Sequence, residues 1–300
     1  MIPLLLNFGT AYSATSPLWR TLQDDTKYLH TGHRKKTHWL WIIRNQYNDS
    51  KDIAKTKKKF LLTPEYSVQS SSKSHIKFTK EEEDYFYSLP TSIDKYIEYY
   101  KKHWDYLDGE YKSLGDFCNK MALMDEEYLC YIRDKLVDFD IKITLIFRDP
   151  VRKIWSQSGT NLDKLYNKEG NVRQTALYGK VYERHARVFG EERVFPMVME
   201  RIWEDPSTLS DFLGHPIPKM HRNAYYPERG TNIREFPEFW DQWRNEKNPI
   251  EYDMLRKAFD ICYQDYERVF GEVPVEWTKK ILINSIVDIV DNNAFWNRFR

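Results

Sequence analysis

The chain opens with an apolar segment that runs directly into a glycine. The segment spans residues 2–8, and its apolar side chains follow no alternating pattern: Ile2, Leu4, Leu5, Leu6 and Phe8. Because alternation marks a strand with one solvent-exposed face, its absence predicts a strand that is buried on both faces. Gly9 then permits a tight exit from this strand, and we expect a positive φ there.

Small or hydroxyl-bearing residues follow Gly9 and lead to a proline. They are Thr10, Ala11, Tyr12, Ser13, Ala14, Thr15 and Ser16, with Pro17 next. Small side chains let backbone N–H groups approach an anion, and hydroxyls add further donors. Thr15 or Ser16 can cap a helix whose first turn accepts Pro17. Since helix N-termini favour anions, the turn suits a phosphate or sulfate, although an ordinary capped turn fits equally well.

A second core-type strand is predicted at residues 143–147, and Arg148 stands at its end. Pro150 can begin a helix, which places Ser156 about two turns further on. The guanidinium of Arg148 is a planar fork of donors that matches phosphate oxygens, and the Ser156 hydroxyl can reach the same anion. The alternative is structural: an arginine at the end of a strand more often forms an ion pair with an acid, here Asp149 or another acidic residue.

Together the two segments resemble the donor-binding segments of sulfotransferases that use 3′-phosphoadenosine-5′-phosphosulfate (PAPS). In that family G-x-x-K-x-G-T-[TS] cradles the 5′-phosphosulfate, and the Arg and Ser of R-[DN]-P-x-x-R-x-x-S bind the 3′-phosphate. The matching residues are Gly9, Thr15, Ser16, Arg148, Asp149, Pro150 and Ser156, with Arg152-Lys153 as the basic pair. The resemblance implies sulfuryl transfer from PAPS to a hydroxyl or amine of a carbohydrate or small molecule. It implies the product 3′,5′-diphosphoadenosine (PAP) and no metal.

Weaker similarities continue in the same order to the end of the chain. Residues 194–200, 203–206 and 212–214 are similar to a family strand and the runs that follow it, and residues 265–274 are similar to the C-terminal helix. Relatives close a basic-glycine loop over the 3′-phosphate, and Arg229-Gly230 is the best local match. The resemblance therefore covers most of the chain.

Two departures from the family pattern concern charge. Tyr12 stands where the loop lysine is expected, and Ala14 replaces the following glycine. Tyrosine donates a hydrogen bond but carries no positive charge at neutral pH. Lys36 falls where relatives carry a glutamate that deprotonates the acceptor. We expect Lys36 to supply the missing charge; the alternative is a solvated strand lysine in a site that has lost its chemistry.

The acceptor must lose a proton, so one base is expected within hydrogen-bond reach. His38, Asp116 and Glu65 are candidates by residue type. Each also has a structural interpretation: a packed strand histidine, a loop-capping aspartate and a surface glutamate. Two other functions stay open beside the enzyme. One is a degenerate nucleotide-binding protein, which Tyr12 favours; the other is a kinase, which the absence of G-x-x-x-x-G-K-[ST] disfavours.

The order of patterns predicts an α/β protein of three layers, α/β/α, with a mainly parallel central sheet. The resemblance implies the P-loop NTPase-like sulfotransferase fold. We expect a single domain over residues 1–300, with an irregular acceptor-side insertion around residues 48–120. Strands are expected at residues 38–43, 141–147 and 193–199 besides the first. Helices are expected after Pro17 and at residues 92–107, 125–138, 173–189, 206–213, 251–270 and 278–291.

Composition narrows the partners and the location. The chain has 46 basic and 45 acidic residues and a formal net charge of +1, which disfavours nucleic-acid binding. Three separated cysteines and no H-x-x-x-H spacing predict buried thiols and no metal site. The apolar start is too short for a signal peptide or membrane span, so we expect a cytoplasmic protein. The partners expected are a nucleotide donor and a small-molecule or glycan acceptor; the oligomeric state is left open.

Overall fold

A computed structural model describes residues 1–9, 15–31, 39–47, 92–118, 121–153, 176–202, 205–219 and 256–278. The chain divides into two compact units. The first comprises residues 1–148 and 180–221, and the second comprises residues 149–179 and 222–300. The single sulfotransferase-like domain over residues 1–300 stays a prediction.

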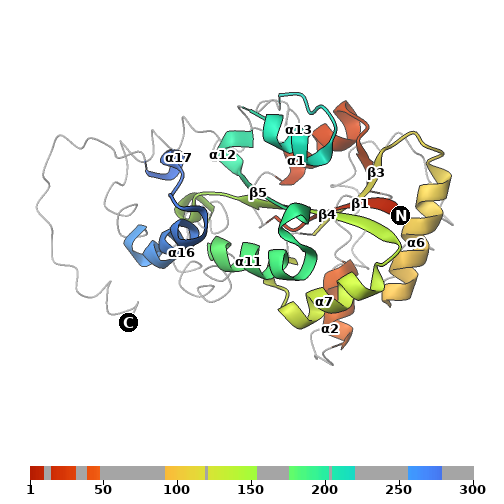
Figure 1. The fold of residues 1–300 in the computed structure, drawn as a ribbon, viewed down its shortest axis with the longest axis horizontal. Helices are drawn as coiled ribbons and strands as arrows, with labels where there is room; N and C mark the ends of the chain where they lie inside the picture. The colour runs from red at the N-terminus through yellow and green to blue at the C-terminus, as the bar shows by residue number, and fades with distance from the viewer. Residues whose placement is uncertain are drawn as a thin grey trace, which may run out of the picture. The chain divides into compact units, whose positions relative to one another are not determined.

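The first unit contains a parallel sheet of five strands. These are β1 (Ile2–Asn7), β2 (Leu29–His30), β3 (Ser113–Phe117), β4 (Phe139–Phe147) and β5 (Val194–Val198). Their order is β2-β3-β1-β4-β5, and every pairing among them is parallel. Figure 1 labels four of these strands: β3, β1, β4 and β5. The central strand is β1, and Leu4, Leu5 and Leu6 are all buried. The predictions of a mainly parallel sheet and of a first strand buried on both faces are confirmed.

Helices cover both faces of this sheet, as predicted (Figure 1). One face carries α1 (Thr15–Arg20), α12 (Met199–Ile202) and α13 (Ser207–Leu213). The other face carries α2 (Trp39–Tyr47), α7 (Glu126–Lys135) and, from residue 180 on, α11 (Tyr178–Phe189). Leu5 of β1 packs into a core with residues of the first group of helices, including Leu18, Trp19 and Leu213. The unit therefore has three layers.

The helix α6 (Ile93–Tyr106) confirms the prediction for residues 92–107. Its buried side chains recur at helical spacing: Ile93, Tyr96, Tyr99, Tyr100 and His103. Ser92 begins the helix by accepting a hydrogen bond from the Lys95 N–H through its Oγ at 3.2 Å. The expected insertion at residues 48–120 is thus regular in its second part, since α6 and β3 both lie there. Residues 48–91 lie outside the part that the structure describes.

The predicted strand at residues 38–43 is wrong, because residues 39–47 form α2. Trp39, Leu40 and Ile43 are buried, and this spacing matches one face of a helix. Trp39 packs edge-on against Tyr99 of α6 at a centroid distance of 4.9 Å. A short run of aromatic and β-branched residues cannot be assigned to strand or helix by period alone. The packing against α6 gives α2 its apolar partner.

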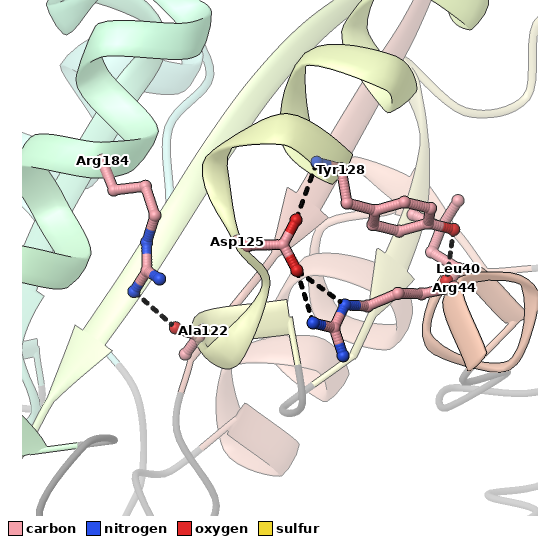
Figure 2. Close-up of polar contacts among 6 residues, drawn as sticks. All are labelled: Leu40, Arg44, Ala122, Asp125, Tyr128 and Arg184. Carbon is pink, nitrogen blue, oxygen red and sulfur yellow. Dashed lines mark hydrogen bonds and ion pairs between the residues drawn. The ribbon is translucent and has the colours of Figure 1, made fainter. Parts of the chain in front are cut away.

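A cap and an ion pair join α2 to α7 (Figure 2). The Asp125 carboxylate accepts the Tyr128 N–H at 2.9 Å, which caps α7, and it also pairs with the Arg44 guanidinium. Burial raises the pKa of Asp125, but its bonds to Arg44 and Tyr128 outweigh burial and hold that pKa below the ordinary value. The Tyr128 hydroxyl donates to the Leu40 carbonyl at 2.7 Å. On the neighbouring α11, Arg184 donates to the Ala122 carbonyl at 3.3 Å.

The second unit packs aromatic residues around Trp277. α16 (Asp260–Phe270) contributes Tyr263 and Tyr266, and Trp277 lies in α17 (Val275–Thr278). The ring of Tyr178 lies 6.0 Å from that of Trp277. The predicted helix at residues 251–270 is confirmed in part by α16. The helix expected at residues 278–291 lies outside the described residues, apart from Thr278 at the end of α17.

Two further observations concern thiols and membranes. All three cysteines are free thiols; the prediction of buried thiols is confirmed for Cys118 and Cys262, whereas Cys130 is half-buried. Among the helices in the described part of the chain, none combines the length and apolar character needed to cross a bilayer.

His185 of α11 is a buried histidine against the first strand. Its ring centroid lies 5.4 Å from that of Phe8, which follows β1. Its Nδ1 lies 2.7 Å from the Val181 carbonyl, so this nitrogen carries the hydrogen and donates. Its Nε2 is buried without a hydrogen-bond partner among the described residues. Burial, the largest cause, lowers the pKa of His185 from 6.5 to about 4.

We predict that His185 makes the unit less stable in acid. Its folded-state pKa of about 4 lies below the unfolded value. The stabilisation is therefore complete above about pH 6.5 and is lost as the pH falls towards 4, by about 3 kcal/mol. Urea unfolding of wild type and of His185→Asn, which keeps a donor for Val181, measures this from pH 7.5 to 4. The free energy of unfolding should fall more steeply for the wild type; equal slopes would contradict the prediction.

Candidate anion-binding site at the carboxyl edge of the sheet

The exits of three strands lie side by side at the carboxyl edge of the sheet. β1 is hydrogen-bonded to β3 on one side and to β4 on the other, and Asn7 is level with Phe117 and with Thr144. The Phe8 N–H donates to the Thr144 carbonyl at 3.0 Å, which extends the pairing beyond β1. Gly9 follows one exit and Arg148 follows the next. In parallel α/β sheets this is the edge at which ligands bind.

A glycine is needed at position 9 because the side chains of Thr15 and Asn7 lie very close to it. A Cβ at this position would lie 2.8 Å from Thr15 Cγ2 and 3.0 Å from Asn7 Oδ1. The expectation of a positive φ at Gly9 is wrong, because Gly9 is absent from the glycines with positive φ. Thr15 and Asn7 instead lie so close to Gly9 that a larger side chain would require one of them to move. This geometry brings Thr15, the first residue of α1, against the strand exit.

Asn7 is a polar residue of this edge that the sequence analysis missed. It is fully buried, and its Nδ2 donates to Thr144 Oγ1 at 2.8 Å while its Oδ1 accepts the Gly9 N–H at 3.2 Å. Its backbone carbonyl accepts the Cys118 N–H at 3.1 Å, just beyond β3. The sequence offered one indication of this role: Asn7 interrupts an apolar strand, and a buried amide needs hydrogen-bond partners.

Arg148 is buried directly after β4, with 2% of its surface exposed. A guanidinium keeps its charge at any ordinary pH, so burying it is costly unless anionic or hydrogen-bonding groups surround it. Asp149, which begins the other unit, accepts the Val151 N–H at 2.9 Å and the Tyr263 hydroxyl at 2.7 Å. Asp149 thereby shapes the helical turn that follows.

Of the basic pair after Pro150, Lys153 is the more deeply buried. Its Nζ lies 5.5 Å from the centroid of the Tyr178 ring. Burial lowers the pKa of Lys153 to about 7, against a smaller opposite effect of Cys262. Its charge therefore changes near neutral pH. Arg152 lies with its Nε 3.8 Å from Asp149 Oδ2.

Asp116 lies inside β3, so its interpretation as a loop-capping residue is wrong. It is buried next to β1, level with Leu6, and accepts a hydrogen bond from the Tyr96 hydroxyl at 3.2 Å. Burial, followed by the charge of Asp116, raises the pKa of both Tyr96 and Tyr100 well above the ordinary value. Those two phenols are therefore neutral donors. A role for Asp116 as the base stays a prediction.

Solved structures of sulfotransferases share this architecture. One from Alicyclobacillus acidocaldarius is 17% identical, with a TM-score of 0.55, over 93% of this chain and 100% of its own. The sulfotransferase domain of the Synechococcus PCC 7002 olefin synthase is 18% identical, with a TM-score of 0.55, over 91% of this chain and 96% of its own. The chain has the sulfotransferase fold. No protein-family model and no curated protein matches the sequence.

Within the sulfotransferase fold, the described part of the predicted site is Gly9, Thr15, Arg148 and Asp116. Ser16 lies in α1. The other predicted site residues lie outside the residues that the structure describes, as does Glu65: Thr10, Ala11, Tyr12, Ser13, Ala14, Lys36, His38, Ser156, Arg229 and Gly230. Their roles stay predictions.

We predict that Gly9→Ala destabilises the unit by about 1–3 kcal/mol, because the new methyl group meets the stiff side chain of Thr15. Gly115→Ala in β3 is the matched control. Its Cβ would lie 2.9 Å from Leu29 Cδ1, at the end of a side chain that can turn away. Urea unfolding should show the larger loss for Gly9→Ala. A larger loss for Gly115→Ala would show that the exit of β1 is not tightly packed.

Proposed function

We propose that this protein is a sulfotransferase that moves a sulfuryl group from PAPS to a hydroxyl or amine of a carbohydrate or small molecule. One observation carries the proposal. In a chain with the sulfotransferase fold, the tight turn at Gly9 and the buried guanidinium of Arg148 follow two strands that pair directly. Two anion-binding segments at one edge match a donor that carries a phosphosulfate and a separate phosphate.

The residues present fit such a donor. Gly9 leaves no Cβ where the chain folds back on Thr15, so backbone N–H groups of residues 10–16 can come close to the phosphosulfate. Arg148 and Ser156 would hold the 3′-phosphate, and Arg229-Gly230 would add a basic contact. PAPS supplies an activated sulfuryl group. The donor itself is part of this proposal and rests on the sequence resemblance.

The reaction asks three things of the chain. A base, with His38, Asp116 and Glu65 as the candidates, takes the proton of the acceptor O–H or N–H. The acceptor atom then forms a bond to sulfur as the bond between sulfur and the 5′-phosphate oxygen breaks, which releases PAP. Donors of the loop must stabilise the charge on the peripheral sulfuryl oxygens, as in phosphoryl transfer. Tyr12 contributes a hydroxyl there, and Lys36 contributes the cation.

We predict that the protein binds PAP without Mg²⁺ and prefers it to ADP, which lacks the 3′-phosphate. Arg148→Ala should weaken PAP binding by about 10- to 100-fold, since it removes charge-assisted hydrogen bonds. Arg148→Lys should recover part of this, because it keeps the charge but not the fork. Isothermal titration calorimetry with PAP and with ADP measures both effects.

Arg193→Ala is the matched control for Arg148. Arg193 precedes β5 at the opposite edge of the sheet and pairs with Asp140 at 3.1 Å. Its replacement should leave PAP affinity unchanged. Equal affinity for PAP and ADP in the wild type would argue against a 3′-phosphate site. A requirement for Mg²⁺ and a preference for ATP would favour a kinase instead.

A degenerate nucleotide-binding protein is the second candidate, and Tyr12 at the position of the loop lysine favours it. Replacement of Lys36 distinguishes an active enzyme from a nucleotide-binding protein without turnover. If the enzyme is active, Lys36→Ala should slow release of PAP from PAPS by about 100-fold or more, because it removes the cation at the sulfuryl group. Lys36→Ala/Tyr12→Lys should restore part of the rate. Chromatography of PAP formed with a panel of hydroxyl and amine acceptors measures this.

Tight PAP binding without turnover by the wild type on any acceptor would support the second candidate. An unchanged rate in Lys36→Ala and Tyr12→Ala would show that neither residue serves the sulfuryl group. A cytoplasmic location stays a prediction.

A further inference from the structure

Asn7 connects the exits of all three central strands. Its side chain bonds to Thr144 of β4 and to Gly9, and its carbonyl accepts the Cys118 N–H beyond β3. The distances are 2.8 Å to Thr144 Oγ1, 3.2 Å to the Gly9 nitrogen and 3.1 Å to the Cys118 nitrogen. No other polar residue lies in β1.

Packing alone would not place an asparagine here. Asn7 and Thr144 have no exposed surface, and Leu5 on the same face of β1 belongs to the apolar core. A buried amide that lost its partners would cost about 1–3 kcal/mol, whereas an apolar side chain would carry no such risk. The amide is well matched to its surroundings because it offers both a donor and an acceptor. Thr144 uses the donor, and Gly9 uses the acceptor.

The bond to Gly9 bears on the loop that follows. Gly9 is the residue at which the chain leaves the strand, and the orientation of its peptide sets the direction in which the loop departs. Asn7 Oδ1 accepts the Gly9 N–H, and it also lies 3.0 Å from the place where a Cβ of Gly9 would stand. The Gly9 N–H is thus engaged within the protein. The backbone donors for an anion must come from residue 10 onward.

We propose that Asn7 is a positioning residue for the PAPS-binding loop: it fixes the peptide of Gly9, the residue from which that loop departs. This inference rests on the proposed function. Thr144 acts through Asn7, because its hydroxyl holds the amide in the orientation that turns Oδ1 towards Gly9. Neither side chain needs to touch the nucleotide.

The test separates positioning from stability. Asn7→Leu keeps a similar side-chain shape but leaves the Thr144 hydroxyl without the bond from Asn7. This variant should therefore have a lower unfolding midpoint and a lower affinity for PAP. Asn7→Leu/Thr144→Val removes both partners and leaves an apolar pair, which restores most of the stability. The double variant should still bind PAP about tenfold more weakly than wild type, since the Gly9 N–H has lost its acceptor. Calorimetry gives the affinity, and urea unfolding gives the midpoint.

Lys142→Met is the matched control. Lys142 lies two residues before Thr144 on β4, and the variant loses a bond of 2.7 Å from Nζ to the Phe212 carbonyl, a bond that involves neither Asn7 nor Gly9. It should lower the unfolding midpoint and leave PAP affinity unchanged. If the double variant binds PAP as tightly as the wild type, Asn7 has no positioning role. If Lys142→Met loses as much PAP affinity as the double variant, the lower stability alone explains the loss of affinity.

Hydrogen exchange of the Gly9 amide gives a readout that does not depend on the ligand. In the wild type this amide should exchange slowly, because it is bonded to a buried acceptor, and in the double variant it should exchange at least about tenfold faster. Equal exchange rates would overturn the inference even if PAP binds. Failure of the wild type to bind PAP, with fast exchange in the variant, would reject the proposed donor while leaving the Asn7–Gly9 bond established.

Discussion

The parallel pairing of β1 with β3 and β4 is the constraint on which the site depends. Its register sets Leu6 level with Asp116 and with Ile143, so β1 and β3 end at the same level and β4 ends three residues further on. A shift of one residue in this pairing would turn every side chain of β1 to the opposite face. Leu5 would then leave the core that it shares with α1 and α13. The burial of β1 on both faces therefore fixes where Gly9 and Arg148 lie.

Four of the buried polar groups in this unit lie in the carboxyl-terminal parts of the three central strands or directly after them. Asn7, Thr144, Asp116 and Arg148 are all buried there, whereas the middle of β1 is leucine. Each such group costs free energy unless it is bonded, so a chain under selection for stability alone would have little reason to place four of them together. Their concentration is what a site needs, because oriented dipoles and charges act most strongly where water is excluded.

The elements that the sequence predicts well are those with a long pattern. Strand β1 follows from an apolar run, β4 follows from a segment rich in isoleucine and threonine, and α6 follows from apolar and aromatic residues at helical spacing. The strand predicted at residues 38–43 fails because five consecutive apolar residues, 39–43, show no period of their own, and only contact with α6 decides. β3 is missed because Gly115 and Asp116 interrupt its apolar residues, and both are buried against other elements.

For the candidate site, Asn7 is missed because its partners lie up to 137 positions away in the sequence. Gly9 is selected in the sequence analysis, but for a positive φ that the structure does not have. The actual reason for a glycine is its close contact with Thr15, which no local sequence pattern reveals.

The exchange of charge between Tyr12 and Lys36 bears on binding and turnover differently. The close approach at Gly9 and the guanidinium of Arg148 do not involve the loop lysine that is missing. A donor held mainly by backbone N–H groups and by Arg148 would keep most of its affinity when one cation is moved. Loss of this cation should destabilise the transition state more than the bound donor, because charge develops on the sulfuryl oxygens only as the bond to sulfur breaks. A cation that arrives from the segment before α2 would serve this step if its ammonium reaches the same oxygens. Affinity for PAP therefore tests the edge of the sheet, and the rate of PAP release tests Lys36.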